Sequence, residues 1–342
     1  MFDPRNILVI DFGQLGDVVL SLPALAAIRK RFRRATITVA VGKPGAEVVA
    51  LSGSADDTLV VDRVALRDGF IPLSVFRVFK LVKEVRAKKF DFVIDLHSLS
   101  ETNLLGFFSG APQRLYSRRP GRSLDYLSNF RPRPPVETDH RARHLIDRYL
   151  DVLGPLEIQN AERLPTLKTR AADAAAIERI LVRAKADAGA PLIGLFPGAG
   201  HPSRRWPLEQ FASLADFLIR NDEVRVLVFL GPEEQDFIKE IRQQFPSSVI
   251  ILEKLAIPQL AAAQARLAAF VSNDTGPMHI ASAVGTPVVL LLDKRAPESY
   301  LPQGDRHRVI YNNVIEDITV DEVYGATRSI LTSGRTATLF AS

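Results

Sequence analysis

The sequence contains no cysteine, and only two methionines and one tryptophan occur among its 342 residues. Without cysteine the chain has no disulfide, no thiolate metal site and no cysteine nucleophile. It has no run of about 18 uncharged apolar residues, so we expect no membrane-spanning helix. Residues 1–5 lack the pattern of a signal peptide. These absences together predict a cytoplasmic protein.

Composition indicates a globular chain with an excess of basic residues. Hydrophobic residues make up 46% and charged residues 24% of the chain, which excludes global disorder. The net charge is +5 and the pI is about 9.5. This excess suits an anionic partner, whether a nucleic acid, a membrane surface or a phosphorylated sugar or lipid. The length predicts two α/β domains.

Strand and helix patterns alternate along both halves of the chain. The predicted strands cover residues 7–11, 36–41, 58–61, 90–96, 114–116, 192–196, 224–230, 249–252, 268–272 and 288–292. The predicted helices cover residues 22–32, 74–88, 139–153, 171–186 and 320–331. Such alternation indicates parallel sheets covered on both faces. A proline-containing linker, residues 154–170, separates domains that we place at 1–160 and 171–319, followed by a tail at 320–342.

The stretch of residues 11–25 joins the first predicted strand to a helix through a glycine-containing loop. Gly13 and Gly16 allow close approach of a ligand to the backbone, and Asp17 follows at the start of the helix. The spacing matches neither the three-glycine dinucleotide fingerprint nor the phosphate-binding P-loop. We therefore expect the loop to present a carboxylate. The simpler and more frequent explanation is that Asp17 only caps the helix.

Two loops of the second half follow predicted strands in the same way. Gly198 lies in a glycine-rich loop that continues to Arg204 and Arg205, whose charges would offset a diphosphate. A later strand ends at Gly231, and Glu234 follows. An acid at this place accepts hydrogen bonds from ribose hydroxyls, although it is equally suited to the first turn of a helix.

The strongest local signal is the Asp274-Thr275-Gly276 turn between a strand and a helix. Backbone N–H groups of Thr275 and Gly276 would point out of the helix N-terminus, which is a ready phosphate site. Asp274 would either serve this site or hold the loop from within. We interpret His279, on the same helix, as a packed structural histidine.

Two segments concentrate basic residues. In the helix at residues 74–89 we expect the apolar side chains to fall mostly on one side, namely Val75, Phe76, Phe79, Val82 and Val85. The helix would then pack on the sheet with a solvated basic face, or that face would attract anionic lipid headgroups. Residues 114–143 carry eight arginines among four prolines and predict a loop. Its arginines are either solvated or bind phosphate or carboxylate.

Taken together, four motifs resemble glycosyltransferase family 9, the heptosyltransferases of lipopolysaccharide synthesis. The motifs are Gly13-x-x-Gly16-Asp17 with Leu22-Pro23-Ala24-Leu25, Phe196-Pro197-Gly198 with Arg205-Trp206-Pro207, Gly231-Pro232-x-Glu234, and Asp274-Thr275-Gly276-Pro277-x-His279-x-Ala281. The resemblance implies an α/β GT-B fold, with two Rossmann-like domains facing each other across a cleft. It also implies inverting transfer from ADP-heptose to the lipopolysaccharide inner core, without metal or cofactor.

The resemblance assigns roles to individual residues. Asp17 would be the general base, and Arg204, in preference to Arg205, would stabilise the departing ADP. The donor-binding set would be Gly198, Arg205, Glu234, Asp274, Thr275, Gly276 and His279. The acceptor-binding set would be Gly16, Arg122 and His144. The helix at residues 320–331 is a candidate to cross back to the first domain.

One departure from the family keeps alternatives open. Members usually have Phe-Gly-x-Thr after the strand at residues 288–292, but this chain reads Asp293-Lys294-Arg295-Ala296-Pro297. The alternatives are another nucleotide-sugar donor, another acceptor, or a basic binding protein without catalysis. We expect peripheral contact with the inner membrane at its cytoplasmic side and no nucleic-acid partner.

Overall fold

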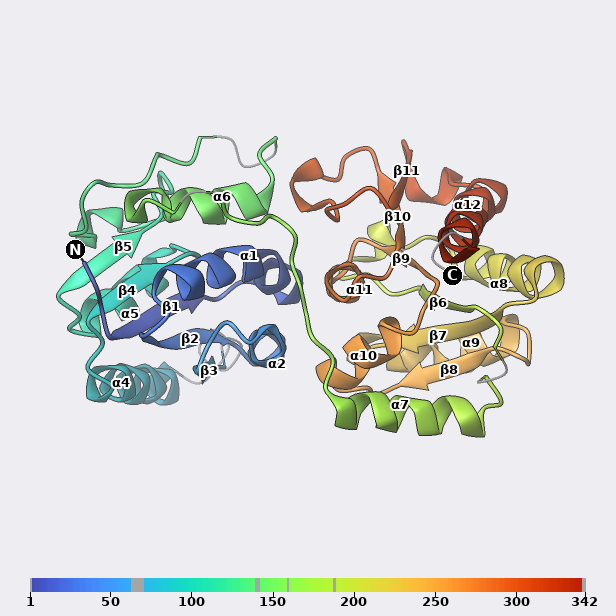
Figure 1. The fold of residues 1–342 in the computed structure, drawn as a ribbon, viewed down its shortest axis with the longest axis horizontal. Coiled ribbons are helices and arrows are strands. Elements are labelled where there is room, and N and C mark those ends of the chain that lie inside the picture. The colour runs from blue at the N-terminus through green and yellow to red at the C-terminus, as the bar shows by residue number, and fades with distance from the viewer. Residues whose placement is uncertain (1, 63–70, 139–141, 159, 187–188, 340–342) are drawn as a thin grey trace. The chain divides into compact units, whose positions relative to one another are not determined.

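The chain divides into two compact units, each built on its own sheet. A computed structural model describes residues 2–62, 71–138, 142–158, 160–186 and 189–339 (Figure 1). The first unit comprises Met1–Thr166 together with Glu298–Leu301, and the second comprises Leu167–Pro297 and Pro302–Ser342. A short segment far along the sequence therefore belongs to the first unit.

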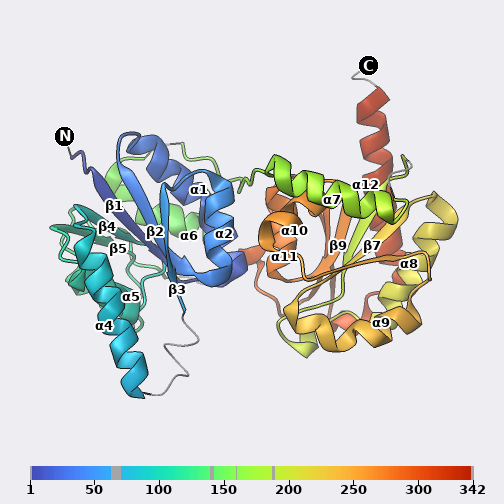
Figure 2. The same cartoon turned by 90° about the horizontal axis from the view of Figure 1, so that it is seen from below.

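The first unit contains a five-stranded sheet in the order β3-β2-β1-β4-β5, with all neighbours parallel. Its strands are β1 (Asn6–Asp11), β2 (Thr36–Gly42), β3 (Asp57–Val61), β4 (Phe92–Asp95) and β5 (Gln113–Tyr116). Its helices are α1 (Leu15–Arg31), α2 (Lys43–Ser52), α4 (Ile71–Ala87), α5 (Ser100–Phe108) and α6 (Leu145–Val152), with 3₁₀ turns η1 (Asp125–Leu127) and η2 (Gly154–Leu156). Helix α1 packs against α2 and α6 on one face, whereas α4 and α5 cover the other (Figure 2).

The second unit contains a six-stranded parallel sheet in the order β11-β10-β9-β6-β7-β8. Its strands are β6 (Leu192–Phe196), β7 (Arg225–Leu230), β8 (Ile250–Glu253), β9 (Ala269–Asn273), β10 (Val288–Asp293) and β11 (Arg308–Asn312). Its helices are α7 (Ala171–Arg183), α8 (Leu208–Asp222), α9 (Ile238–Gln244), α10 (Ile257–Gln264), α11 (Gly276–Ala283) and α12 (Val320–Leu339), with 3₁₀ turns η3 (Pro202–Arg204), η4 (Pro232–Phe237) and η6 (Ile315–Asp317). The turn η5 (Glu298–Tyr300) belongs to the first unit.

Both sheets are Rossmann-like and confirm the predicted α/β class. The central strands β1 and β6 are apolar and buried almost throughout, as expected for parallel strands covered on both faces. Helix α12 packs against α8 in the second unit. No described helix is long and apolar enough to cross a membrane.

Several elements differ from the sequence prediction, and α1, α6 and β11 show the reasons. Helix α1 begins at Leu15, seven residues before the predicted start, because Asp17 at its third position caps the backbone of Gln14. Helix α6 begins at Leu145; of the residues predicted before it, 139–141 lie outside the described part. Strand β11 was not predicted, because its partly exposed edge sequence, Arg308–Asn312, is too polar to resemble a buried strand.

The strand orders determine where ligand sites can lie. In each sheet the order reverses beside the first strand of the unit, between β1 and β4 and between β6 and β9. Loops that leave the carboxyl ends of strands at such a reversal form the usual ligand-binding crevice of open α/β sheets. The Asp17 loop follows β1, and the loops of Arg204 and Asp274 follow β6 and β9.

Candidate functional site

Asp17 is held at the start of α1 by the loop that leaves β1. Its Oδ2 accepts a hydrogen bond from the Gln14 N–H at 2.9 Å, and Asp11 Oδ1 accepts one from the Gly13 N–H at 2.9 Å. A Cβ atom at position 13 would lie 2.4 Å from Asp17 Cβ. The loop therefore requires glycine at position 13. Asp17 caps helix α1, as the simpler explanation in the sequence analysis predicts.

Asp17 also lines a cavity of the first unit, which we call the Asp17 cavity. Its lining residues are Asp17, Leu96, His97, Ser117, Arg119, Glu137, Leu145, Arg148, Tyr149 and Tyr300. Glu137 bridges two cations, since Oε2 lies 3.1 Å from Arg119 Nε and Oε1 contacts Arg148 Nη2. Burial, followed by the negative charge of Asp17, raises the pKa of Tyr300. The cavity thus combines two carboxylates, those of Asp17 and Glu137, with two arginines and two phenols.

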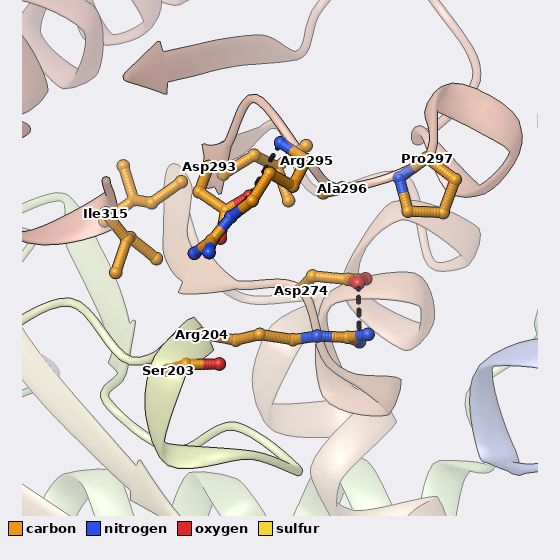
Figure 3. A pocket seen from close by; sticks show the side chains of 10 residues that line it. Ser203, Arg204, Asp274, Asp293, Arg295, Ala296, Pro297 and Ile315 are labelled. Atoms are coloured by element: carbon orange, nitrogen blue, oxygen red, sulfur yellow. Dashed lines mark hydrogen bonds and ion pairs between the residues drawn. The ribbon is translucent and has the colours of Figure 1, made fainter. Parts of the chain in front are cut away.

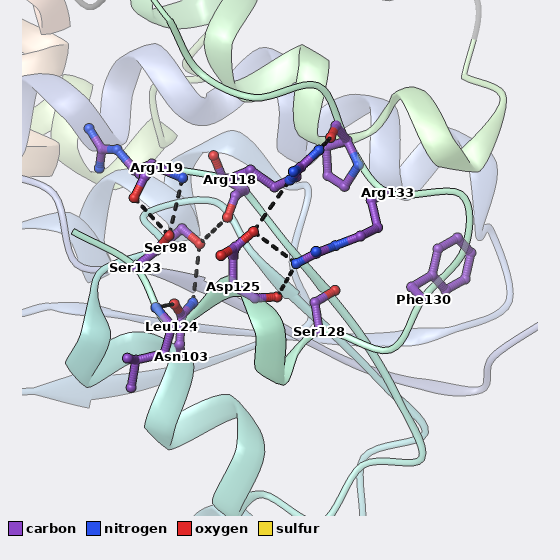
Figure 4. Close-up of polar contacts among 12 residues, drawn as sticks. Ser98, Asn103, Arg118, Arg119, Ser123, Leu124, Asp125, Ser128, Phe130 and Arg133 are labelled. Atoms are coloured by element: carbon purple, nitrogen blue, oxygen red, sulfur yellow. Dashed lines mark hydrogen bonds and ion pairs between the residues drawn. The ribbon is translucent and has the colours of Figure 1, made fainter. Parts of the chain in front are cut away.

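The arginine-rich loop pairs mostly within the first unit (Figure 4). Asp125 accepts from both Arg118 Nε, at 3.3 Å, and Arg133 Nη2, at 2.8 Å. Arg119 donates to the His97 carbonyl at 2.7 Å and extends to the Asp17 cavity. Further partners in the unit hold Arg114, Arg131 and Arg143. Arg141 lies outside the described residues.

The three predicted acceptor residues differ in their surroundings. Gly16 is the second residue of α1. His144 caps α6, since its Nδ1 accepts from the Ile146 N–H at 3.2 Å, and its Nε2 lies 2.9 Å from the Leu301 carbonyl. Arg122 has an exposed side chain. The lining of the Asp17 cavity includes neither His144 nor Arg122, so their acceptor roles stay predictions.

Sequence reasoning missed most of the Asp17 cavity. Arg148 and Tyr149 are buried on α6, and Tyr300 comes from the distant segment Glu298–Leu301. The available signal for Arg148 was its place on the apolar stripe of a short amphipathic helix, beside Tyr149 and Val152. The sequence around Tyr300 contains no local motif that connects it to Asp17.

Arg204 and Arg205 have different environments in the second unit (Figure 3 shows Arg204). Arg204 lies in η3 with 56% of its side chain exposed, and its Nη1 is 3.5 Å from Asp274 Oδ2. Arg205 donates from Nε and Nη2 to the Ala199 carbonyl, at 3.2 and 3.0 Å, and stacks over the Phe237 ring. Arg204 therefore lines a cavity, whereas Arg205 braces its own loop.

The space beside Arg204 is a cavity of about 200 Å³, which we call the Arg204 cavity. It is lined by Ser203, Arg204, Asp274, Leu291, Leu292, Asp293, Arg295, Ala296, Pro297 and Ile315. Asp293 accepts from the Arg295 N–H at 2.7 Å and from Arg295 Nη2 at 2.9 Å (Figure 3). The Arg295 hydrogen bond holds the pKa of Asp293 below its usual value. Each guanidinium in this cavity thus has a carboxylate beside it.

The Asp274-Thr275-Gly276 turn forms the start of α11 as predicted. Thr275 is the N-cap residue, in extended conformation, and the helix begins at Gly276. The Thr275 hydroxyl lies 3.3 Å from the hydroxyl of Ser272. His279 is 3% exposed, which is consistent with a packed histidine.

Asn273 is a structural residue of this site that sequence reasoning missed. Its Nδ2 donates to the Pro197 and Gly198 carbonyls, at 3.0 and 3.1 Å, while its Oδ1 accepts from the Trp206 N–H at 3.0 Å. One buried side chain at the end of β9 therefore fixes both ends of the loop that carries Arg204.

Glu234 fills the space behind the same loop. Its Oε2 accepts from the Gly231 N–H at 2.9 Å, and the side chain is almost completely buried. A Cβ atom at position 198 would lie 2.1 Å from Glu234 Oε1, so only glycine fits. Burial raises the pKa of Glu234. Its predicted contact with a ribose stays a prediction.

Known proteins resemble the chain in both sequence and fold. Lipooligosaccharide heptosyltransferase 2 of Haemophilus influenzae is 33% identical over 126 residues, a match covering 35% of this chain and 36% of that protein. Lipopolysaccharide heptosyltransferase 2 of Escherichia coli is 26% identical over 315 residues, covering 89% of this chain and 87% of that protein.

Solved structures share the fold across nearly the whole chain. A family 9 glycosyltransferase from Veillonella parvula has a TM-score of 0.84 at 24% identity, covering 97% of this chain and 98% of the other. E. coli ADP-heptose lps heptosyltransferase II has a TM-score of 0.80 at 22% identity, covering 97% of this chain and 100% of the other. These neighbours establish the two-sheet architecture as the GT-B class.

The family model extends over both units. Residues 78–323 match the model described as glycosyltransferase family 9 (heptosyltransferase). The match begins in α4 and ends in α12, and therefore includes both the Arg204 cavity and most of the Asp17 cavity. The chain belongs to glycosyltransferase family 9.

Proposed function

We propose that this chain transfers a heptose from ADP-heptose to the inner core of lipopolysaccharide, with inversion and without a metal ion. Family membership supports a glycosyl transfer, and the heptosyltransferases named above support heptose and a lipopolysaccharide acceptor. The observation that carries the proposal is the position of Asp17 in a cavity that also contains two arginines. We place the reaction at the cytoplasmic face of the inner membrane, in peripheral contact with it.

In the proposed reaction Asp17 is the general base. Its carboxylate accepts the proton of the acceptor hydroxyl while that oxygen forms a bond to the anomeric carbon. The bond from this carbon to the ADP oxygen breaks, and ADP departs with the electron pair. The Arg119–Glu137–Arg148 group would orient an anionic acceptor next to Asp17.

Arg204 would offset the charge that develops on departing ADP. Its exposed guanidinium, loosely paired with Asp274, is available to a diphosphate in the Arg204 cavity. The N-terminus of α11 at Thr275 and Gly276 would supply backbone N–H groups to the same diphosphate. Gly198 and Arg205 would shape this site, and Glu234 and His279 would support it from behind.

The test is an Asp17→Asn variant assayed for transfer and for ADP binding. Loss of the base should lower kcat about 10²- to 10⁴-fold and leave the dissociation constant of ADP within about twofold. Asp173→Asn is the matched control, because Asp173 occupies the same third helical position in α7. Transfer that survives in Asp17→Asn at the rate of the control would rule out Asp17 as the base.

The alternative is a different nucleotide-sugar donor in place of ADP-heptose. The Asp293–Arg295 pair in the Arg204 cavity favours it. The family usually has an uncharged Phe-Gly-x-Thr segment there. Thermal-shift titrations with ADP, UDP and GDP distinguish the donors, since a ligand at about 100 times its dissociation constant adds roughly 2.7 kcal/mol of stability. Stabilisation by UDP or GDP in preference to ADP would favour the alternative.

A further inference from the structure

Helix α4 exposes two phenylalanines on its solvent side. Phe76 and Phe79 have 62% and 67% of their surface exposed, whereas Val85 is fully buried against the sheet. At 100° per residue, Phe76 lies half a turn away from Val85. Our expectation that Phe76 and Phe79 share an apolar side with Val82 and Val85 is therefore wrong. The sheet is covered by Leu81, Val82 and Val85 alone among the described side chains of α4.

Helix α5 also exposes large apolar side chains. It packs beside α4 on the same face of the sheet (Figure 2), and its exposed side chains include Leu104, Phe107 and Phe108, at 39%, 42% and 45%. We define the α4–α5 surface as Phe76, Phe79, Leu104, Phe107 and Phe108. Large apolar side chains exposed on helices that cover the same face of a sheet are candidates for a binding surface.

Basic residues surround the phenylalanines of α4. Lys80 and Lys83 follow Phe76 at helical spacings of four and seven and thus share its stripe. Between residues 76 and 87 the exposed charged side chains are Arg77, Lys80, Lys83, Glu84 and Arg86, four basic and one acidic. The net charge of this face is therefore +3.

We infer that the α4–α5 surface docks on an anionic lipid bilayer. Aromatic rings enter the boundary between headgroups and acyl chains, while lysines and arginines attract the headgroup phosphates. Pairing with a second copy would bring two faces of charge +3 together, which charge repulsion opposes. Docking of this surface on a bilayer does not require the reaction proposed above.

Vesicle sedimentation of the full chain tests the inference. The vesicles contain phosphatidylglycerol and phosphatidylethanolamine, with phosphatidylcholine vesicles for comparison, and no nucleotide sugar is present. The chain should sediment with the anionic vesicles and remain in solution with phosphatidylcholine. Binding should weaken as salt rises, because ions screen the lysines from the lipid charge.

Two variants separate the apolar from the ionic contribution. Phe76→Ser/Phe79→Ser should lower the partition coefficient at least about tenfold, since apolar burial is lost. Lys80→Gln/Lys83→Gln should lower the partition coefficient about 25-fold, because each lysine near an anionic surface contributes roughly a factor of five. The matched controls are Val182→Ser and Arg179→Gln/Arg183→Gln on α7, whose side chains are also exposed. The controls should bind as the unchanged chain does.

Three results would overturn the inference. The first is that the unchanged chain stays in solution with anionic vesicles at low salt. The second is that the two α4 variants bind vesicles as well as the α7 controls do. The third is a concentration-dependent dimer that the phenylalanine variant abolishes, with no lipid binding. Circular dichroism of each variant establishes that it is folded before binding is measured. Because transfer is not measured, failure of the proposed reaction would leave these outcomes unchanged.

Discussion

The carboxylate of Glu234 occupies the space in which a side chain at position 198 would have to lie. The contact, 2.1 Å from a Cβ at Gly198 to Oε1, involves a carboxylate already held by the Gly231 N–H. Relief therefore requires the loss of that hydrogen bond or a shift of the loop that leads to Arg204. The buried Glu234 carboxylate thus excludes a side chain at position 198, and it thereby constrains the loop that leads to the proposed diphosphate site.

Gly198→Ala should lower the free energy of unfolding by about 1–3 kcal/mol through this overpacking and weaken ADP binding. Differential scanning calorimetry and ADP titration measure the two effects. Gly200→Ala is the control, since no atom lies within 4 Å of a Cβ built there. Equal effects of both substitutions would show that the Glu234 contact does not control the loop.

Arg204 and Arg205 should separate binding from stability. Arg204→Gln should weaken ADP binding by about 1.5–3 kcal/mol, the value of a hydrogen bond to a charged group, with little change in Tm. Arg205→Gln should lower Tm, because it removes both hydrogen bonds to the Ala199 carbonyl. Titration of ADP and thermal unfolding of both variants check this division; the reverse pattern would contradict it.

Asp95 should give the first unit an unusual dependence on pH. Burial raises the pKa of Asp95 to about 7 from 3.8, so between these values the folded state binds more protons than the unfolded state. Stability contributed by this group therefore falls as pH rises from about 4 to about 7. The stability difference between the unchanged chain and Asp95→Asn, measured by urea unfolding, should narrow or reverse over that range. A difference independent of pH would contradict the prediction.

At the scale of elements, the sequence predicted strands well where burial decides. The apolar runs of β1 and β6 predicted these strands correctly, because both faces of a central parallel strand are covered and its residues are apolar. The polar edge strand β11 gave no such signal. On α4, we expected Phe76 and Phe79 on the same side as Val82 and Val85, but Phe76 lies half a turn from Val85 and both phenylalanines are exposed.

The candidate site could be predicted only where its residues follow a strand directly. Asp17, Arg204 and Asp274 follow strand ends closely in the sequence, and each of them lines one of the two cavities. Asn273 contacts both ends of a loop about 70 residues away in the sequence, and Tyr300 reaches the Asp17 cavity from a distant part of the chain. Contacts between distant segments leave no local periodicity, and therefore no pattern to read.

His144 should stabilise α6 in its neutral form. Burial lowers the pKa of His144, so the unfolded state binds more protons and stability is lost as pH falls below about 6.5. His144→Ala should cost about 1–2 kcal/mol at pH 7.5 and less at pH 5.5. His201→Ala is the control, because His201 caps the 3₁₀ turn η3 through the same ring nitrogen but is exposed. Urea unfolding at both pH values measures the stability cost of each substitution. The same change in cost between pH 7.5 and pH 5.5 for both histidines would contradict the prediction for His144.

At the scale of the whole molecule, Trp206 provides a signal from one unit alone. It is the single tryptophan of the chain, it is buried in the second unit, and its Nε1 donates to the Ile318 carbonyl at 2.8 Å. Fluorescence therefore reports the second unit, whereas circular dichroism reports both. The two signals together assign a change in stability to one unit.

Tyr300→Ala should destabilise the first unit, although residue 300 lies in the sequence of the second half. We expect a loss of about 1–3 kcal/mol in the circular dichroism transition, with the Trp206 fluorescence transition unchanged. Phe217→Ala, on α8, is the converse control and should shift the fluorescence transition. A shift of Trp206 fluorescence in Tyr300→Ala would contradict the assignment of Glu298–Leu301 to the first unit.

The return of Glu298–Leu301 to the first unit has a consequence for biosynthesis. A ribosome releases the chain from its N-terminus, so the first sheet can assemble while residue 300 is still untranslated. The cavity around Asp17 acquires Tyr300 only when about seven-eighths of the polypeptide has been made. A nascent or truncated chain would thus carry a folded first sheet with an incomplete Asp17 cavity.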